Sequence, residues 1–209
     1  MPGQKASETV RREQILRAAY EVASRKGIDG LTVRAVAARA KLSHGLVLFH
    51  FKRKDQLVDA LLDRVLATSL KLHMSEDVAR IAHPLDRLRA LLQQEMDRLS
   101  SEPRRTRLFF EYWALGTRHS ATRAKISAEL DRYRAAFRAT TEDILQAEPA
   151  RFTGVTSDGL AAVAVSFING CAVQAMIDPE HFDINEYLAA VQGIIGRPPR
   201  QQHGEHADG

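Results

Sequence analysis

The sequence feature that most constrains the fold is residues 31–51, where a break too short for anything but a tight turn joins two short helical patterns. Thr32 and Ser43 can each cap one of these helices, because a hydroxyl oxygen accepts a hydrogen bond from a first-turn N–H. Apolar residues of the first helix recur at the spacing of a single helix face. They are Val33, Val36, Ala37 and Ala40. Small alanines let a second helix cross that face closely, so the pattern predicts a helix-turn-helix.

The second helix of this pair is a candidate for reading DNA. When such a helix enters the major groove, its first turn meets the base edges. Val47 and Phe51, one turn apart, are expected to anchor the helix in the core. The candidates for base contacts are His44, Gly45, Leu46, Phe49 and His50. The alternative for an alanine-rich pair is two core helices with no role in binding nucleic acid.

Basic residues favour the DNA-binding interpretation. Lys52, Arg53 and Lys54 open the next predicted helix, where both the cations and the helix N-terminus attract phosphate. Residues 1–55 hold 12 Lys and Arg against 5 Asp and Glu, whereas the remainder holds 18 against 21. Such segregation indicates a dedicated binding face rather than general attraction to polyanions. The candidates for phosphate contacts are Thr32, Arg34, Ser43, Lys52 and Lys54, with Arg11 and Arg12 as secondary candidates.

The helix pair and the run that follows it resemble the N-terminal DNA-binding domain of the TetR family of bacterial transcriptional regulators. The resemblance covers residues 9–66 and extends to the rest of the chain only in architecture. It rests on Thr32, Ala37, Ala40, Ser43, Gly45, His50, Phe51, Lys54 and Leu57. Lys41 stands where the family usually has the turn glycine, so it must adopt a left-handed conformation or shift the turn. Leu48 replaces a tyrosine that usually contacts a phosphate, which removes one expected contact.

Apolar periodicity predicts an all-α protein of about nine helices. An N-terminal three-helix helix-turn-helix domain is expected over residues 8–55, a C-terminal helical domain for ligand binding and dimerisation over 56–196, and a disordered tail over 197–209. The tail is polar and interrupted by prolines and glycines. Beyond the helix pair, helices are expected over residues 8–26, 54–71, 84–99, 104–115, 120–146, 157–177 and 184–195.

Aromatic residues are concentrated in the helix expected over residues 104–115, although the whole chain is only 6% aromatic. This concentration requires either a cavity or a packed core, and both alternatives are open. The expected effector site consists of Phe110, Glu111, Trp113, Tyr133, Phe137, Phe167, Asn169, Cys171 and Gln174. Because aromatic faces attract cations, the site suits an apolar or cationic ligand, with Glu111 as a counter-charge.

The helix expected over residues 157–177 has almost no charge and is rich in small residues. Such a helix must be covered nearly all round, and a second subunit is the expected cover. Together with the helix over residues 184–195 it predicts a four-helix interface of a homodimer. The expected interface residues are Ala164, Ile168, Ala172, Tyr187, Val191 and Ile195.

No motif for catalysis, cofactor binding or metal binding is evident, so no enzymatic activity is expected. His203 and His206 lie in the expected tail, where a flexible segment makes a poor chelate. Cys171 is the only cysteine, which suits a reducing cytoplasm. The N-terminus lacks the apolar core of a signal peptide, and no uninterrupted apolar run reaches the roughly 18 residues of a membrane span.

These expectations combine into a homodimeric transcriptional regulator that responds to a small molecule. The resemblance implies a repressor that a ligand releases from a near-palindromic operator in double-stranded DNA. The second half is broadly similar in architecture to the choline-sensing BetI-type subgroup, which does not identify an effector. The alternatives are an architectural DNA-binding protein without an effector and a helical small-molecule binding protein or enzyme with a vestigial DNA domain.

Overall fold

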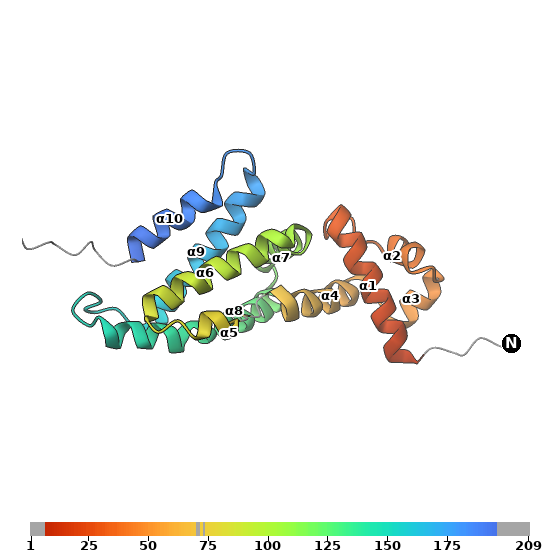
Figure 1. The fold of residues 1–209 in the computed structure, drawn as a ribbon. Helices are drawn as coiled ribbons and strands as arrows, with labels where there is room; N and C mark the ends of the chain where they lie inside the picture. The colour runs from red at the N-terminus through yellow and green to blue at the C-terminus, as the bar shows by residue number, and fades with distance from the viewer. Residues whose placement is uncertain (1–6, 70–71, 73, 196–209) are drawn as a thin grey trace, which may run out of the picture.

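The computed structural model describes residues 7–69, 72 and 74–195, and within these ranges the chain forms ten α-helices and no strand (Figure 1). The helices are α1 (Glu8–Lys26), α2 (Val33–Ala40), α3 (His44–His50), α4 (Lys54–Ser69), α5 (Glu76–Ala79), α6 (Pro84–Ser101), α7 (Pro103–Gly116), α8 (Ser120–Ala147), α9 (Ser157–Ile177) and α10 (Ile184–Ile195). The all-α class is confirmed. The expected tail, with His203 and His206, lies outside the described residues.

The helix α5 explains why ten helices are found where about nine were expected. It is a single turn of four residues, too short to produce an apolar periodicity. Ser75 caps it by accepting a hydrogen bond from the Val78 N–H, and the Val78 side chain is buried. A cap and one buried residue are sufficient for a turn that is held by its packing on α6.

The helices α1, α2 and α3 and the first half of α4 form the head, at one end of the molecule (Figure 1). Ile15, Leu31, Val36 and Val47 are fully buried at its centre. Both predicted caps are present, since the Thr32 hydroxyl accepts from the Ala35 N–H and the Ser43 hydroxyl from the Leu46 N–H. Caps of this kind stabilise a short helix by about 1 kcal/mol each.

The turn between α2 and α3 keeps its usual path although it lacks a glycine. Lys41 adopts the left-handed conformation, with φ 55° and ψ 45°. Its N–H donates to the Ala38 carbonyl, and the Leu42 N–H donates to the Ala37 carbonyl, so the last carbonyls of α2 are satisfied. The expected choice between a strained lysine and a shifted turn is therefore resolved in favour of the strained lysine, at a cost of about 1 kcal/mol.

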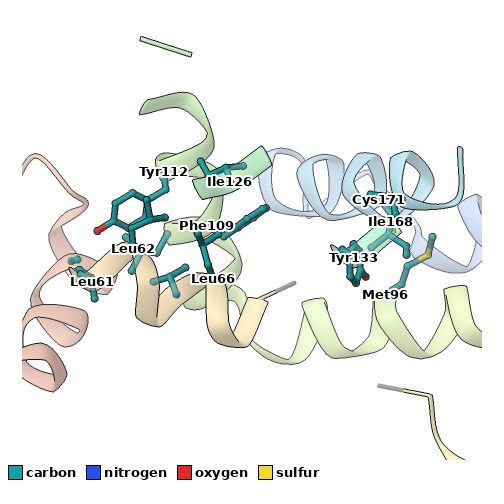
Figure 2. Packing of buried hydrophobic residues seen from close by; sticks show 14 of the residues in the cluster. Leu61, Leu62, Leu66, Met96, Phe109, Tyr112, Ile126, Tyr133, Ile168 and Cys171 are labelled. Atoms are coloured by element: carbon teal, nitrogen blue, oxygen red, sulfur yellow. The ribbon is translucent and has the colours of Figure 1, made fainter. Parts of the chain in front are cut away.

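The remaining helices α5–α10 and the second half of α4 form the body. The helix α4 belongs to both parts: Leu57 and Leu61 are buried in its first half, whereas Leu66 near its end lies beside Phe109 of α7 (Figure 2). Further along the body, α6, α8 and α9 pack together, and Met96, Tyr133, Ile168 and Cys171 lie close together between them (Figure 2). One continuous hydrophobic core therefore extends from the head through the body.

The helix α9 is long and apolar enough to cross a membrane by length and composition alone, and no other described helix is. Its 21 residues include one charged side chain, Asp158. The expectation about uninterrupted apolar runs is not contradicted, because polar side chains interrupt α9. The face of α9 turned toward α6 and α8 is buried in the body, as in the central helix of a helical bundle.

Candidate DNA-binding surface and effector site

The helix α3 presents one side to solvent and is here called the reading helix, residues 44–50. Val47 is fully buried, whereas His44, Gly45 and Phe49 are exposed, and the ring of Phe49 is 75% exposed. Leu46 and His50 are only half-buried, so they are less accessible than expected. A ring in the major groove can contact a thymine methyl group.

Gly45 lies in the first turn of the reading helix, where glycine is the less stable choice. A glycine inside a helix costs about 1 kcal/mol relative to alanine. A Cβ added at Gly45 would meet no atom within 4 Å, so the packing of this chain does not require the glycine. No contact within the described chain accounts for it.

The five candidates for phosphate contacts are all exposed: Thr32, Arg34, Ser43, Lys52 and Lys54. The two hydroxyls already accept backbone N–H groups as helix caps. Each hydroxyl can still donate its own proton to a phosphate oxygen. These side chains come from the starts of α2, of the reading helix itself and of α4, and helix N-termini favour phosphate.

Arg12 has a structural contact that argues against a role at phosphate. Its Nη1 donates to the His50 carbonyl over 2.7 Å, and its guanidinium lies 4.3 Å from the centre of the Phe51 ring. These contacts fasten α1 to the end of the reading helix. The His50 Nδ1 is buried without a hydrogen-bond partner in the described structure. Arg11 donates to Gln14 over 2.6 Å.

The expected effector residues lie in different environments. Phe110 and Trp113 stack with ring centres 5.8 Å apart, and Tyr133 and Phe137 form a separate edge-to-face pair at 5.5 Å. Tyr133, Phe137 and Cys171 are at most 2% exposed. Burial raises the pKa of the Cys171 thiol to about 11. The buried rings fill the core, which is the alternative that the sequence left open for them.

The other expected effector residues point in different directions. Asn169 and Cys171 are two positions apart on α9, so they face nearly opposite sides of the helix. Gln174 is exposed and donates to the Gly170 carbonyl of its own helix. The Glu111 carboxylate accepts the Ile28 N–H of the head over 2.7 Å, while the half-buried Phe167 accepts the Tyr187 hydroxyl at its carbonyl. The expectation of a single effector site stays a prediction for these residues.

Sequence reasoning missed a buried carboxylate in the body. Glu95 is fully buried and accepts hydrogen bonds from the Tyr133 hydroxyl at 2.8 Å and from Arg98 at 2.7 Å. Burial, followed by the charge of Glu95, raises the pKa of the Tyr133 hydroxyl. A signal was available, because Glu95 follows Leu88 and Leu92 by seven and three residues and therefore lies on the apolar face of α6.

A groove of about 800 Å³ lies between the head and the body. We call it the junction groove. Its walls come from the first half of α4, the end of α7 and the start of α8, and they include Val58, Leu62, Tyr112, Leu115, Ala121 and Thr122. The sequence could not indicate it, because the start of α4 is separated from the α7–α8 segment by a long stretch of chain and the two carry no shared motif.

The expected dimer residues face the interior of their own subunit. Ala164, Ile168, Ala172, Val191 and Ile195 are at most 8% exposed, and the Tyr187 hydroxyl donates to the Phe167 carbonyl over 2.9 Å. These residues are already covered within one subunit, and their role at an interface stays a prediction. Because α9 is apolar all round, periodicity does not show which side turns outward. Large apolar residues on the opposite side are exposed and form the outer face: Val163, Val173, Ile177 and Ile194.

A helix-turn-helix head with an exposed reading helix, carried on a helical body, is the architecture of a DNA-binding transcriptional regulator. Residues 15–61 match the family model for bacterial regulatory proteins of the tetR family. Residues 84–197 match the model for the C-terminal part of BetI-type transcriptional repressors. The chain belongs to the TetR family. This confirms the resemblance found in the sequence.

Individual relatives agree with this assignment. An uncharacterized HTH-type transcriptional regulator in the dhlA 5′ region of Xanthobacter autotrophicus is 31% identical over 88% of this chain and 89% of its own length. A regulator from Saccharomonospora viridis in complex with choline has a TM-score of 0.70 and 17% identity over 90% of this chain and 96% of its own. The Bacillus subtilis regulator FadR in complex with stearoyl-CoA has a TM-score of 0.67 and 18% identity over 88% and 96%. These two structures show a shared fold, and the family consists of regulators rather than enzymes.

Proposed function

We propose that this protein is a homodimeric, cytoplasmic repressor that a small-molecule effector releases from a near-palindromic operator. The exposed side of the reading helix is the observation that carries the DNA-binding part. No contact within the chain explains the glycine at Gly45 or the exposed ring of Phe49. Exposed cations follow them in the sequence, up to the start of α4. In a DNA complex the base-facing residues supply discrimination, whereas Arg34 and Lys54 supply affinity through phosphate.

The outer face of α9 and α10 supports the dimer. Ile177 is 75% exposed and Ile194 is 67% exposed, and exposed apolar area of this kind is typical of protein interfaces. Two-fold pairing of α9 and α10 with their symmetry mates would cover it with a four-helix contact. The pairing would also give each dimer two reading helices, which matches two half-sites on DNA.

Neighbouring residues of α7 support a response to an effector. The Glu111 carboxylate accepts the Ile28 N–H over 2.7 Å, and the Tyr112 hydroxyl donates to the Val58 carbonyl over 2.7 Å. The first contact holds the end of α1 and the second holds α4. A shift of α7 is thereby passed to the head at two points. An effector that favours one position of α7 changes the population of heads spaced correctly for the operator.

The close approach of Glu111 to the head requires a glycine. Gly27 ends α1 with φ 71°, and a Cβ there would lie 3.1 Å from the nearer Glu111 oxygen. Glycine provides both the left-handed conformation and the space. Choline and stearoyl-CoA in two regulators of the same fold support a ligand-binding body, and they do not choose between ligand classes.

The experiment that tests this function is selection of genomic DNA by the purified protein, followed by sequencing of the bound fragments. A repressor of this type should enrich a small set of fragments that share one near-palindromic sequence. An architectural DNA-binding protein should enrich none, because it binds through the backbone alone. Recovery of DNA with no fragment enriched and no shared sequence would therefore reject the proposal in favour of the architectural alternative.

A further inference from the structure

The exposed residues of the reading helix differ in chemistry. They are His44, Gly45 and Phe49, and of these three only His44 has a side chain that can form a hydrogen bond. Gly45 and Phe49 are four positions apart, and residues with that spacing share one face of a helix. We call this the Gly45–Phe49 face. Apolar contact is the interaction that its side chains can make.

The Gly45–Phe49 face is open to a group that approaches from outside. The Phe49 ring is 75% exposed although it meets the His50 ring edge-to-face, with ring centres 5.2 Å apart. A Cβ added at Gly45 would meet no atom within 4 Å, so the space over Gly45 is empty one turn before the ring. An exposed ring and an empty position therefore lie on the same face of the helix.

The position of this face gives the exposed ring its meaning. A single exposed apolar side chain is common on protein surfaces and by itself identifies no site. Phe49, however, lies on the second helix of a helix-turn-helix head of the TetR family, and in such heads that helix enters the major groove. The helix α3 lies at the end of the molecule away from the body (Figure 1). The ring is therefore placed where base edges approach.

The chemistry of the major groove selects the group that this face can read. Every base pair presents hydrogen-bond donors or acceptors there, which a phenyl ring cannot satisfy. Covering such polar groups without a hydrogen bond costs free energy. The C5-methyl group of thymine is the apolar group that unmodified DNA offers in the major groove, and its burial against a ring is favourable. The Gly45–Phe49 face therefore favours thymine.

We propose that Gly45 and Phe49 bind the methyl group of one thymine in each half-site, and that this contact is a determinant of sequence specificity. The Phe49 ring covers the methyl group, and the empty space at Gly45 lets the base edge come close to the helix. His44 remains available for a hydrogen bond to a neighbouring base pair. The presence of two half-sites rests on the function proposed above, whereas the thymine contact itself requires only sequence-specific binding.

Duplexes in which uracil replaces thymine test the contact on the full chain. A binding site is first selected from a library of random duplexes, so the test does not depend on a role in the cell. Each thymine of that site is then replaced singly by uracil, which lacks the C5-methyl group and keeps the hydrogen-bonding groups of thymine. One replacement in each half-site should raise the Kd about fourfold, the effect of one methyl-sized apolar group.

Variants identify the side chain that contacts the methyl group. Phe49→Ala should raise the Kd for the thymine duplex and abolish the effect of that same uracil, whereas Phe49→Leu should keep part of the effect because leucine is still apolar. Gly45→Ala should also reduce the effect, since its methyl group occupies the space that the base edge enters. Circular dichroism should show the wild-type fold in all three, because both positions are exposed. Val155→Ala is the matched control, since Val155 is an exposed apolar residue of the body, and its response to uracil should equal that of the wild type.

Several results would overturn the thymine contact. These are a library that yields no preferred sequence, a selected site without thymine, and uracil replacements that leave the Kd unchanged at every position. Equal loss of affinity for the thymine and uracil duplexes in Phe49→Ala would also overturn it, because the ring would then lie against the sugar-phosphate backbone.

Selection of genomic fragments is measured separately from the library, so that the two proposals can fail independently. If genomic fragments share one near-palindromic sequence but uracil has no effect on binding, the thymine contact fails alone. If uracil acts as expected on the library site but no genomic fragment is enriched, the repressor function fails and the thymine contact stands.

Discussion

At the scale of single residues, those in and next to the reading helix connect the sequence most directly to the proposed function. The caps Thr32 and Ser43 were predictable, because hydroxyls at those positions have one common local use. The meaning of Gly45 needed the structure, since only the empty space around it shows that the chain itself does not require a glycine. Glu95 was missed because a single charged residue on an apolar face is easily treated as an exception.

Gly45→Ala should separate stability from DNA binding. A methyl group there meets nothing in the protein and improves helix propensity, so the free energy of unfolding should stay constant or rise by up to about 1 kcal/mol. DNA affinity should fall, because the added methyl group lies on the surface that approaches the bases. Urea unfolding and fluorescence anisotropy on a selected fragment measure the two effects. A variant that is destabilised, or that binds DNA as the wild type does, would contradict this role.

Lys54→Ala and His44→Ala should weaken DNA binding in different ways. Loss of the Lys54 contact should reduce affinity for every sequence and flatten the salt dependence by about one unit of slope. Loss of His44 should cost about 1–3 kcal/mol on the selected sequence only. Anisotropy titrations on selected and random duplexes at several salt concentrations distinguish the two. Equal losses on both duplexes for both variants would remove the division into phosphate and base contacts.

At the scale of the elements, local sequence signals predicted where helices begin and end. They did not predict which side of each helix packs against its neighbours. The bounds of α1, α9 and α10 match the predicted ones, because their ends carry clear caps and breaks. The outward side of α9 could not be predicted, since a helix that is apolar all round has no preferred face. The junction groove forms where the first half of α4 meets the distant α7–α8 segment. Only the packing of α4, α7 and α8 brings them together.

Glu111→Ala should loosen the contact between α7 and the head. The variant leaves the Ile28 N–H without its acceptor, and a hydrogen bond to a charged group is worth about 1.5–3 kcal/mol. Hydrogen exchange at the Ile28 amide should accelerate, and Glu111→Gln should restore part of the protection because its amide oxygen still accepts. Glu142→Ala is the control, since Glu142 is exposed on α8. Unchanged exchange in Glu111→Ala would mean that the contact does not hold the head.

At the scale of the whole molecule, α9 has two apolar sides, and the helices of one subunit bury only one of them. The inner side is buried against α6 and α8 within the subunit, and the outer face is the part that the proposed dimer would cover. The sequence did not show which side of α9 is the inner one, because Ala164 and Ala172 look the same as outward-facing positions in an apolar helix. The monomer core therefore uses the residues that were expected at the interface.

Val173→Asp should produce a folded monomer. Val173 is 37% exposed on the outer face, and pairing would bury the new charge without a partner at a cost of several kcal/mol. Ala172→Asp should instead unfold the body, because Ala172 is only 8% exposed within one subunit. Sedimentation and circular dichroism measure the two outcomes, with Ala139→Asp on the exposed side of α8 as the control. A stable dimer of Val173→Asp would place the interface elsewhere.

The most direct measurement is a hydroxyl-radical footprint of the wild-type protein on its most enriched genomic fragment. Two reading helices related by two-fold symmetry should protect two equivalent half-sites, separated by one helical turn of about 10 base pairs or a multiple of it. Protection should come from two subunits per fragment and should be lost together in Val173→Asp. Continuous protection without half-sites, or a single protected half-site occupied by one subunit, would contradict a dimeric repressor that reads its operator through α3.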